Sequence, residues 1–445
     1  MNDLPVGRRV AQWRVRRNMT QQQFADRLGK SKSWVDKVER GVRRLERVSN
    51  LREVAATLRI DVEVLLAARP VRPTPVAAGV EGVRTALARY HLPGADRPPL
   101  VGELAARLEH AEQSYRHARY PALLPLLPGL LDAAREAHAA RPGATDVLLV
   151  SVYVLIALVL VKVDQGELAW LAADRGMTVA LATQDPQVAG IATVSLSQAL
   201  RSRGRRRSAL DAALVAADRL GAHGSSSANV ALRGTLLLQA ALAAAGGGDV
   251  HLARQSLDQA AAIAQDIGPD GGWGGSGAST GGASGGAGPG GEDPGGEGSG
   301  GAGPGGEGSG GEGSGDGRSG SAGCGGAVFG VGGFGRSAVE AAQVVADAAL
   351  GDVTTATARH ERLMASGEWR WLPPEHRSAY LLDVARAYAL AGDMHRAGQA
   401  VLDAERTARS EVHDRPTVRK LVAVVWRSAD APVGLAQLAA TLRVT

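Results

Sequence analysis

Side chains of the types that can bind phosphate groups and base edges gather near the start of the chain. Between residues 20 and 44 they include Gln21, Lys30, Ser31, Lys32, Ser33, Lys37, Arg43 and Arg44. Ammonium and guanidinium groups neutralise DNA phosphates, and amide, hydroxyl and ammonium groups can bond to base edges in the major groove. Residues 1–60 hold 12 Arg and 3 Lys against 3 Asp and 3 Glu, a net charge of +9, whereas the whole chain carries +5. The positive charge is therefore local, as a DNA-binding surface requires.

Other reactive side chains in the sequence do not combine into a catalytic or metal site. The ten His residues are scattered, no His-Glu-x-x-His motif occurs, and Cys324 is the single cysteine. No nucleophile can be placed by motif beside an oriented base and an oxyanion donor. We therefore predict no enzyme, no catalytic residue, no metal and no cofactor. A lone cysteine forms no internal disulfide, which fits a reducing cytoplasm.

Two short helices around a tight turn are expected to position the cationic side chains. Thr20 and Gln23 have the spacing of a capping box at the start of the first helix. Gly29 suits a left-handed turn, and Ser31 can cap the second helix. Val35 begins the apolar inner face of that second helix. This order is typical of a DNA-binding helix-turn-helix, with an ordinary amphipathic helical hairpin as the alternative.

Residues 1–70 resemble the lambda-repressor-like (XRE) helix-turn-helix family of transcriptional regulators, and Glu39-Arg40-Gly41 matches the family's ending of the third helix. The resemblance implies a five-helix domain, with helices at about Val6–Arg17, Gln21–Leu28, Lys32–Arg40, Asn50–Leu58 and Val62–Ala67. The expected core consists of Val10, Trp13, Phe24, Leu28, Val35, Val38, Leu51, Val54, Leu58 and Leu65.

The family resemblance also implies roles for the DNA-binding side chains. Gln21 would contact the DNA backbone, and Lys30 and Ser31 would contact phosphate. Base edges would be contacted by Lys32, Ser33 and Lys37, with the two lysines favouring the O6 and N7 acceptors of guanine. Arg43 and Arg44 follow directly after Gly41, which favours phosphate contact over a solvated basic surface. Trp34 is expected to pack under the second helix, or else to lie on a sugar-phosphate strand.

The rest of the chain has an all-α composition with an internal repeat. A Pro-rich linker at 71–77 precedes helical sequence at 78–267 and 336–445. Gly is followed by Ala five and twelve residues later at Gly204, Gly248 and Gly392, and partly at Gly351; near Gly166 only Ala173 and Ala180 keep the seven-residue spacing. This pattern resembles tetratricopeptide-like repeats, and predicts an α-α solenoid that binds a peptide or a partner protein.

Two segments of unusual composition need separate interpretation. Residues 268–335 hold 35 of the 59 glycines and predict a disordered loop insertion within a continuous solenoid; no phosphate-binding Gly-Lys-Ser/Thr motif follows a strand there. Val147–Val161 is an apolar run of fifteen residues. It is shorter than the roughly 18–20 residues of a membrane span, so we predict a buried first helix of the solenoid and no membrane segment or signal peptide.

Two classes of function follow from these patterns. The first is a sequence-specific transcriptional regulator that binds double-stranded DNA as a homodimer, with a solenoid that senses a peptide or small molecule or mediates dimerisation. The resemblance is to the helix-turn-helix plus tetratricopeptide regulators of Gram-positive bacteria, and the Ala-, Arg- and Gly-rich composition indicates an actinobacterial source. The alternative is a protein-docking scaffold that the amino-terminal domain places on DNA. Either protein is expected in the cytoplasm, associated with the nucleoid.

Overall fold

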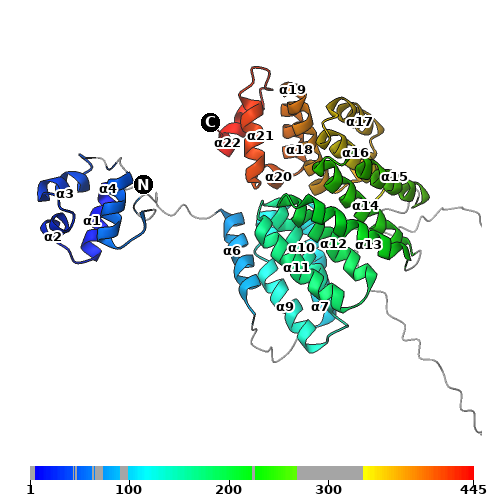
Figure 1. The fold of residues 1–445 in the computed structure, drawn as a ribbon, viewed down its shortest axis with the longest axis horizontal. Helices are drawn as coiled ribbons and strands as arrows, with labels where there is room; N and C mark the ends of the chain where they lie inside the picture. The colour runs from blue at the N-terminus through cyan, green and yellow to red at the C-terminus, as the bar shows by residue number, and fades with distance from the viewer. Residues whose placement is uncertain are drawn as a thin grey trace, which may run out of the picture. The chain divides into compact units, whose positions relative to one another are not determined.

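The computed structural model describes residues 6–43, 45, 48–62, 65, 74–90, 99–222, 226–267 and 334–444. These residues form α-helices and one short 3-10 helix, with no strand among them, which confirms the all-α class. The chain divides into two compact units, Met1–Gly79 and Val80–Thr445. Figure 1 shows the helices of both units with their labels.

The first unit packs its helices around a small apolar core. The helices are α1 (Val6–Arg16), α2 (Gln21–Arg27), α3 (Lys32–Glu39) and α4 (Val48–Leu58). Phe24 and Leu58 are fully buried, and Trp13 and Trp34 are partly buried against the same core. Each expected helix is present to within two residues at either end, except the fifth at Val62–Ala67, most of which lies outside the described residues.

Local signals explain where α2 and α3 begin. Thr20 Oγ1 accepts a hydrogen bond from the Gln23 backbone N–H at 3.2 Å, and Gln23 Oε1 accepts one from the Thr20 N–H at 2.9 Å. Ser31 Oγ accepts from the Trp34 N–H at 3.2 Å. Gly29, between the two helices, has φ +62°. The capping box, the turn glycine and the second cap are therefore confirmed.

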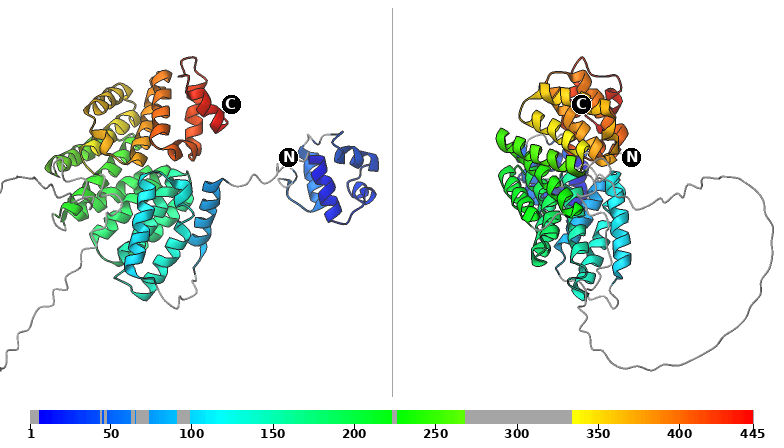
Figure 2. Two further views of the ribbon diagram at one scale, coloured as in Figure 1. Left: turned by 180° about the vertical axis from the view of Figure 1, so that it is seen from behind. Right: turned by 90° about the vertical axis from the view of Figure 1, so that its right-hand side faces the viewer.

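The second unit contains an array of helical hairpins in its described residues. The paired helices are α10 (Asp146–Lys162) with α11 (Gly166–Ala182), α12 (Pro186–Ser202) with α13 (Arg206–Ala222), α14 (Ser227–Gly247) with α15 (Val250–Ile267), α16 (Arg336–Ala349) with α17 (Val353–Ser366), and α18 (Pro374–Leu390) with α19 (Met394–Thr407). The first helix of each hairpin packs against the first helix of the next, and each second helix packs beside its own partner. Figure 2 shows this stacking from two further directions.

Further helices precede and follow the hairpin array. Before it come α6 (Pro75–Ala88), α7 (Val101–Arg116), α8 (Tyr120–Leu123) and α9 (Leu127–Ala140). The 3-10 helix η1 (Glu368–Trp371) lies between the fourth and fifth hairpins, and α20 (Arg409–His413), α21 (Pro416–Trp426) and α22 (Leu435–Leu442) end the described chain. Helices outside the repeat pattern therefore precede the first hairpin and follow the last one.

A residue with positive φ turns the chain inside each hairpin. Four of these residues are the repeat glycines Gly204, Gly248, Gly351 and Gly392, with φ between +76° and +89°. In the first hairpin the turn residue is Asp164, at φ 58°, because Asp tolerates the left-handed region better than most residues. The register of that copy therefore begins at Asp164 and continues through Ala169 and Gly176. The sequence pattern indicates only a degenerate copy near Gly166, with Ala173 and Ala180, and does not point to Asp164.

The apolar run at Val147–Val161 forms most of α10, in which every residue from Leu149 to Leu160 is buried. It packs against α7, α9, α11 and α12, and so confirms a buried helix. It is the first helix of the hairpin array, as expected, and α6 to α9 precede it in the second unit. Among the described residues, α14 is the one helix long and apolar enough to cross a membrane, and most of its apolar window is buried inside the array.

The hairpins on either side of the Gly-rich segment pack directly against each other. Both α14 and α15 contact α16, although 68 residues separate Ile267 from Arg336 in the sequence. Phe334 is 2% exposed, and its ring packs against Gly234 of α14. A Cβ at position 234 would lie 2.1 Å from Cζ of that ring, so α14 must carry a glycine there. Apart from Phe334 and Gly335, the segment expected to be disordered lies outside the described residues.

Candidate nucleic-acid interface

The exposed surface of α3 carries most of the side chains expected to contact DNA. Lys32, Ser33 and Lys37 are exposed on the helix, and Lys30 and Ser31 are exposed at its amino-terminal end. Ser33 and Lys37 are four residues apart, so they share one face of the helix. The structure therefore brings these five residues together on one short segment, while their contacts with DNA stay a prediction.

A buried ionic network holds α3 against α1 and α2. Glu39, at the end of α3, is 6% exposed and accepts from Arg14 Nε at 2.6 Å and from Arg14 Nη2 at 3.1 Å. Arg14 also donates from Nη1 to the Met19 carbonyl at 2.7 Å. A two-pronged Arg–carboxylate pair fixes orientation as well as distance. Glu39 thus sets the angle at which α3 presents its exposed lysines.

A close backbone approach reinforces that angle. Gly7 of α1 lies against the last turn of α3, where a Cβ would be 1.8 Å from the Val38 carbonyl oxygen. Since any side chain at this position would force the two helices apart, glycine is required for their contact. The sequence analysis did not identify Gly7, because nothing in the local pattern shows which helix it would meet.

Gln21 has an internal partner in the structure. Its side-chain Nε2 donates to Glu39 Oε2 at 2.8 Å, and the residue is half-buried at the start of α2. Gln21 is therefore the third member of the Glu39 network, a role that sequence reasoning missed. The signal was present in Glu39-Arg40-Gly41, but only the fold shows that Glu39 faces inward. The expected contact between Gln21 and the DNA backbone stays a prediction.

Of the two arginines expected to contact phosphate after α3, the structure describes Arg43. Arg43 is exposed, and its guanidinium carbon lies 6.0 Å from the centre of the Trp34 ring, within the range of a cation–π contact. Its backbone N–H donates to the Lys37 carbonyl at 2.9 Å. Trp34 packs partly against the core, as expected, and also supports Arg43. Arg44 lies outside the described residues.

A carboxylate on α3 adds a feature that the sequence analysis did not weigh. Asp36 stands between Lys32 and Lys37, and its Oδ2 is 2.5 Å from Arg40 Nη2. Both side chains are exposed, so the pair is solvated and contributes little to stability. An Asp on a base-contacting helix can accept from the N4 amino group of cytosine. Asp36 is therefore a further candidate for base contact, held in place by Arg40.

Comparisons with known proteins assign the first unit. Residues 5–68 match the family model described as a helix-turn-helix domain. The first unit therefore contains a helix-turn-helix domain, and the chain joins it to an array of helical hairpins.

Two solved structures are similar to the chain. One is PlcR of Bacillus thuringiensis in complex with the peptide PapR7 and DNA, at 12% identity over 59% of this chain and 95% of that one, with a TM-score of 0.26. The other is aspartyl phosphate phosphatase F from Bacillus subtilis, at 12% identity over 92% of this chain and 94% of that one, with a TM-score of 0.38. Both TM-scores are low, so neither likeness assigns a function. No curated protein matches the chain.

Proposed function

We propose that this protein is a sequence-specific, DNA-binding transcriptional regulator. Its helix-turn-helix domain binds duplex DNA through α3, and its helical-repeat unit senses a peptide or small molecule or pairs two copies of the chain. The supporting observation is the exposed row of Lys32, Ser33 and Lys37 on a capped helix that the Glu39 network fixes in place. No enzymatic step is part of this proposal. A regulator of this kind acts on the chromosome, so we expect the protein in the cytoplasm, associated with the nucleoid.

Selection of binding sites from random duplexes with the full-length chain tests the DNA-binding role. We expect one enriched motif, and an affinity for it that falls steeply as salt rises, because several phosphates are neutralised. Arg43→Ala should weaken binding to all duplexes alike, since Arg43 lies beside the helix and not on it. Recovery of no motif, with affinity that does not change between low and moderate salt, would refute the proposal.

Dimerisation is the second part of the proposal. One small helix-turn-helix contacts only a half-site, and two-fold dimers usually bind half-sites about one helical turn apart. Full-length protein should therefore bind a palindromic site as a dimer, and more tightly than a single half-site. Sedimentation of the complex measures the number of chains. One chain bound to a full palindrome, with half-site affinity, would exclude this arrangement.

A cleft in the helical-repeat unit supports the sensing role over a docking scaffold. It has a volume of about 470 Å³ and lies between α11 and α13, at the start of α12. Its lining is mostly apolar and includes Leu181, Val215 and the carboxylate residue Asp211. A cleft of this volume suits a small ligand or one peptide side chain. A compound that raises the Tm of the wild-type protein but not of Val215→Trp would place the ligand there.

A further inference from the structure

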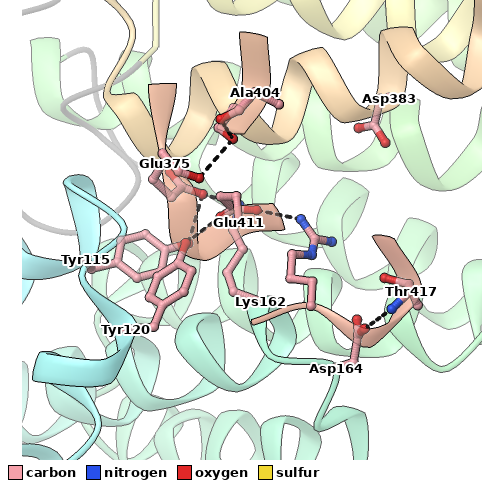
Figure 3. A network of polar contacts seen from close by, with 12 residues as sticks. Tyr115, Tyr120, Lys162, Asp164, Glu375, Asp383, Ala404, Glu411 and Thr417 are labelled. Atoms are coloured by element: carbon pink, nitrogen blue, oxygen red, sulfur yellow. Dashed lines mark hydrogen bonds and ion pairs between the residues drawn. The ribbon is translucent and has the colours of Figure 1, made fainter. Parts of the chain in front are cut away.

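A buried cluster of charges joins parts of the second unit that are far apart in the sequence. The Lys162 ammonium, at the end of α10, pairs with Glu375 of α18 and lies 3.1 Å from Glu411 Oε1 of α20. Glu411 is 0% exposed, and Lys162 is 8% exposed. Figure 3 shows the lysine between the two carboxylates. Residues separated by more than 200 positions therefore share one ionic centre.

Further polar contacts complete the cluster around this centre. Tyr115 of α7 donates to Glu375 Oε1 at 3.2 Å, and Tyr120 of α8 donates to Glu411 Oε1. Arg415 Nη1 lies 2.6 Å from Glu411 Oε2. Nearby, the Thr417 backbone N–H donates to Asp164 Oδ2 at 2.8 Å, which fastens the start of α21 to the turn of the first hairpin. Every carboxylate of the cluster thus has at least two partners.

The charges of the cluster balance in the closed arrangement. Two cations, Lys162 and Arg415, face two carboxylates, Glu375 and Glu411. Burial by itself would raise the pKa of Glu411, but Lys162 and Arg415 hold that pKa below its ordinary value. Burial, reinforced by the nearby carboxylates, raises the pKa of both Tyr115 and Tyr120, so both hydroxyls stay protonated and can donate. The cluster is therefore a complete set of donors and acceptors only while its two halves are together.

The position of the cluster in the array gives it a particular role. One half belongs to α7, α8 and α10, at the beginning of the hairpin array, and the other belongs to α18, α20 and α21, at its end. Neighbouring hairpins inside the array pack through buried Ala, Leu and Val side chains. Separating apolar surfaces exposes them to water at a cost, whereas separated charges regain hydration that offsets much of the lost ion pairing. The junction between the two ends is therefore the part of the array best suited to open.

We propose that this cluster is a clasp that closes the hairpin array on itself, and that its release lets α18–α22 move away from α7–α10 while the hairpins stay folded. The closed form is the one that the structure shows. The open form exposes Lys162, Glu375 and Glu411 to water, together with the face of α10 that they cover. This property concerns the second unit alone, so it holds whether or not the first unit binds DNA.

Distance measurement between spin labels on the full-length chain tests the clasp. The labels replace exposed side chains on its two sides, in a Cys324→Ser background with His110→Cys on α7 and Lys420→Cys on α21. We expect one distance population when the clasp is intact. Lys162→Met should add a second population at longer distance, because it leaves the buried Glu411 and the half-buried Glu375 without their shared cation.

Hydrogen exchange on the same variants separates opening from general destabilisation. In Lys162→Met, amides of α20 and α21 should exchange roughly tenfold faster or more, while those of α12 to α15 keep their wild-type rates. Glu375→Gln is a milder variant that keeps an oxygen acceptor for Tyr115, and should give a smaller change in the same segments. It decides the test if Lys162→Met does not fold.

Arg396→Met is the matched control, because it removes a cation from an exposed ion pair with Glu361 in the same array. It should leave both the distance populations and the exchange rates unchanged. The proposal is overturned if Lys162→Met and Glu375→Gln each keep a single distance population, or if exchange rises uniformly across the hairpins.

Discussion

The two units of this protein each contain a buried ionic network, and the networks differ in the length of chain that they connect. In the helix-turn-helix domain, Glu39 binds Arg14 and Gln21, which lie 25 and 18 residues away. In the helical-repeat unit, Glu411 binds Tyr120, 291 residues away, and Lys162. The first network orients neighbouring helices, whereas the second joins the two ends of an array.

This difference in reach has consequences for stability. Loss of the Glu39 network loosens a small domain whose apolar core also holds the same three helices together. Loss of the Glu411 network separates parts that no turn or adjacent hairpin keeps in place. A short-range network is therefore supported by its surroundings, while the long-range network must itself maintain the junction. Substitutions in both units measure this contrast.

Glu411→Ala should have the largest effect. It removes a fully buried carboxylate and leaves one positive charge uncompensated, because Lys162 keeps its pair with Glu375 while Arg415 loses its pair with Glu411. Loss of one partner of a buried ion pair typically costs about 3–5 kcal/mol. Denaturant unfolding followed by circular dichroism would show the loss in the transition of the helical-repeat unit. Arg396→Met, which removes one partner of an exposed ion pair, should change the free energy of unfolding by no more than about 1 kcal/mol. If Glu411→Ala lowered the free energy of unfolding as little as the control does, the Glu411 network would not be what maintains the junction.

Glu112→Gln tests a buried carboxylate outside the clasp, through its pH dependence. Burial raises the pKa of Glu112 to about 8, with Arg116 lowering it only in part. The folded state therefore holds a proton that the unfolded state releases, so stability falls as pH rises from about 4.5 to about 8.

The glutamine variant should remove that loss of stability. The free energy of unfolding of the variant should exceed that of wild type by an amount that grows across this pH window and reaches about 3 kcal/mol. At pH values below the window the difference should vanish. Thermal melts at several pH values measure it, and the transition of the helix-turn-helix domain provides an internal reference. An advantage that does not change with pH would show that Glu112 is ionised in the folded protein.

Glu39→Ala should destabilise the helix-turn-helix domain by about 2–3 kcal/mol, since hydrogen bonds to charged groups are among the stronger ones. Only the transition of this domain should move, and hydrogen exchange should rise in α1 to α3. Asp36→Ala removes a carboxylate of the same helix from an exposed pair, and should change stability by less than about 1 kcal/mol. Equal losses in the two variants would mean that the Glu39 network does not orient α3.

Lys32→Ala should have the smallest effect on folding, within about 0.5 kcal/mol, because the side chain is exposed. Its effect should appear in DNA binding, as a loss of about 1–3 kcal/mol on the selected motif and much less on random duplex. Lys420→Ala, an exposed lysine on α21, is the matched control and should change neither affinity. If Lys32→Ala weakens both kinds of DNA equally, Lys32 contacts the backbone instead of a base.

The accuracy of the sequence-based predictions follows the range of the interactions involved. The starts of α2 and α3 were predictable because Thr20, Gly29 and Ser31 act on backbone groups a few residues away. Asp164 was missed as a turn residue because a left-handed Asp leaves no pattern as clear as a glycine. The neighbours of α10 were not predictable either, since a helix apolar on every side does not show which helices surround it.

The candidate DNA-binding site shows the same division. Exposure of Lys32 and Lys37 follows from the amphipathic pattern of α3. The pairing of Gln21 with Glu39 does not, because it depends on the angle between α2 and α3. Gly7 likewise acquires its importance only from the carbonyl that α3 places beside it.

The sequence by itself determined the all-α class, the helix-turn-helix domain with its exposed lysines, and the glycine turns of four hairpins. Each of these depends on caps, periodicity or backbone freedom within about one helical turn. Only the tertiary structure decided that Lys162, Glu375 and Glu411 meet. The path of an array results from small rotations summed over successive hairpins, and no spacing in the sequence records their total. Lys162 meets the two carboxylates only where that sum returns the end of the array to its beginning.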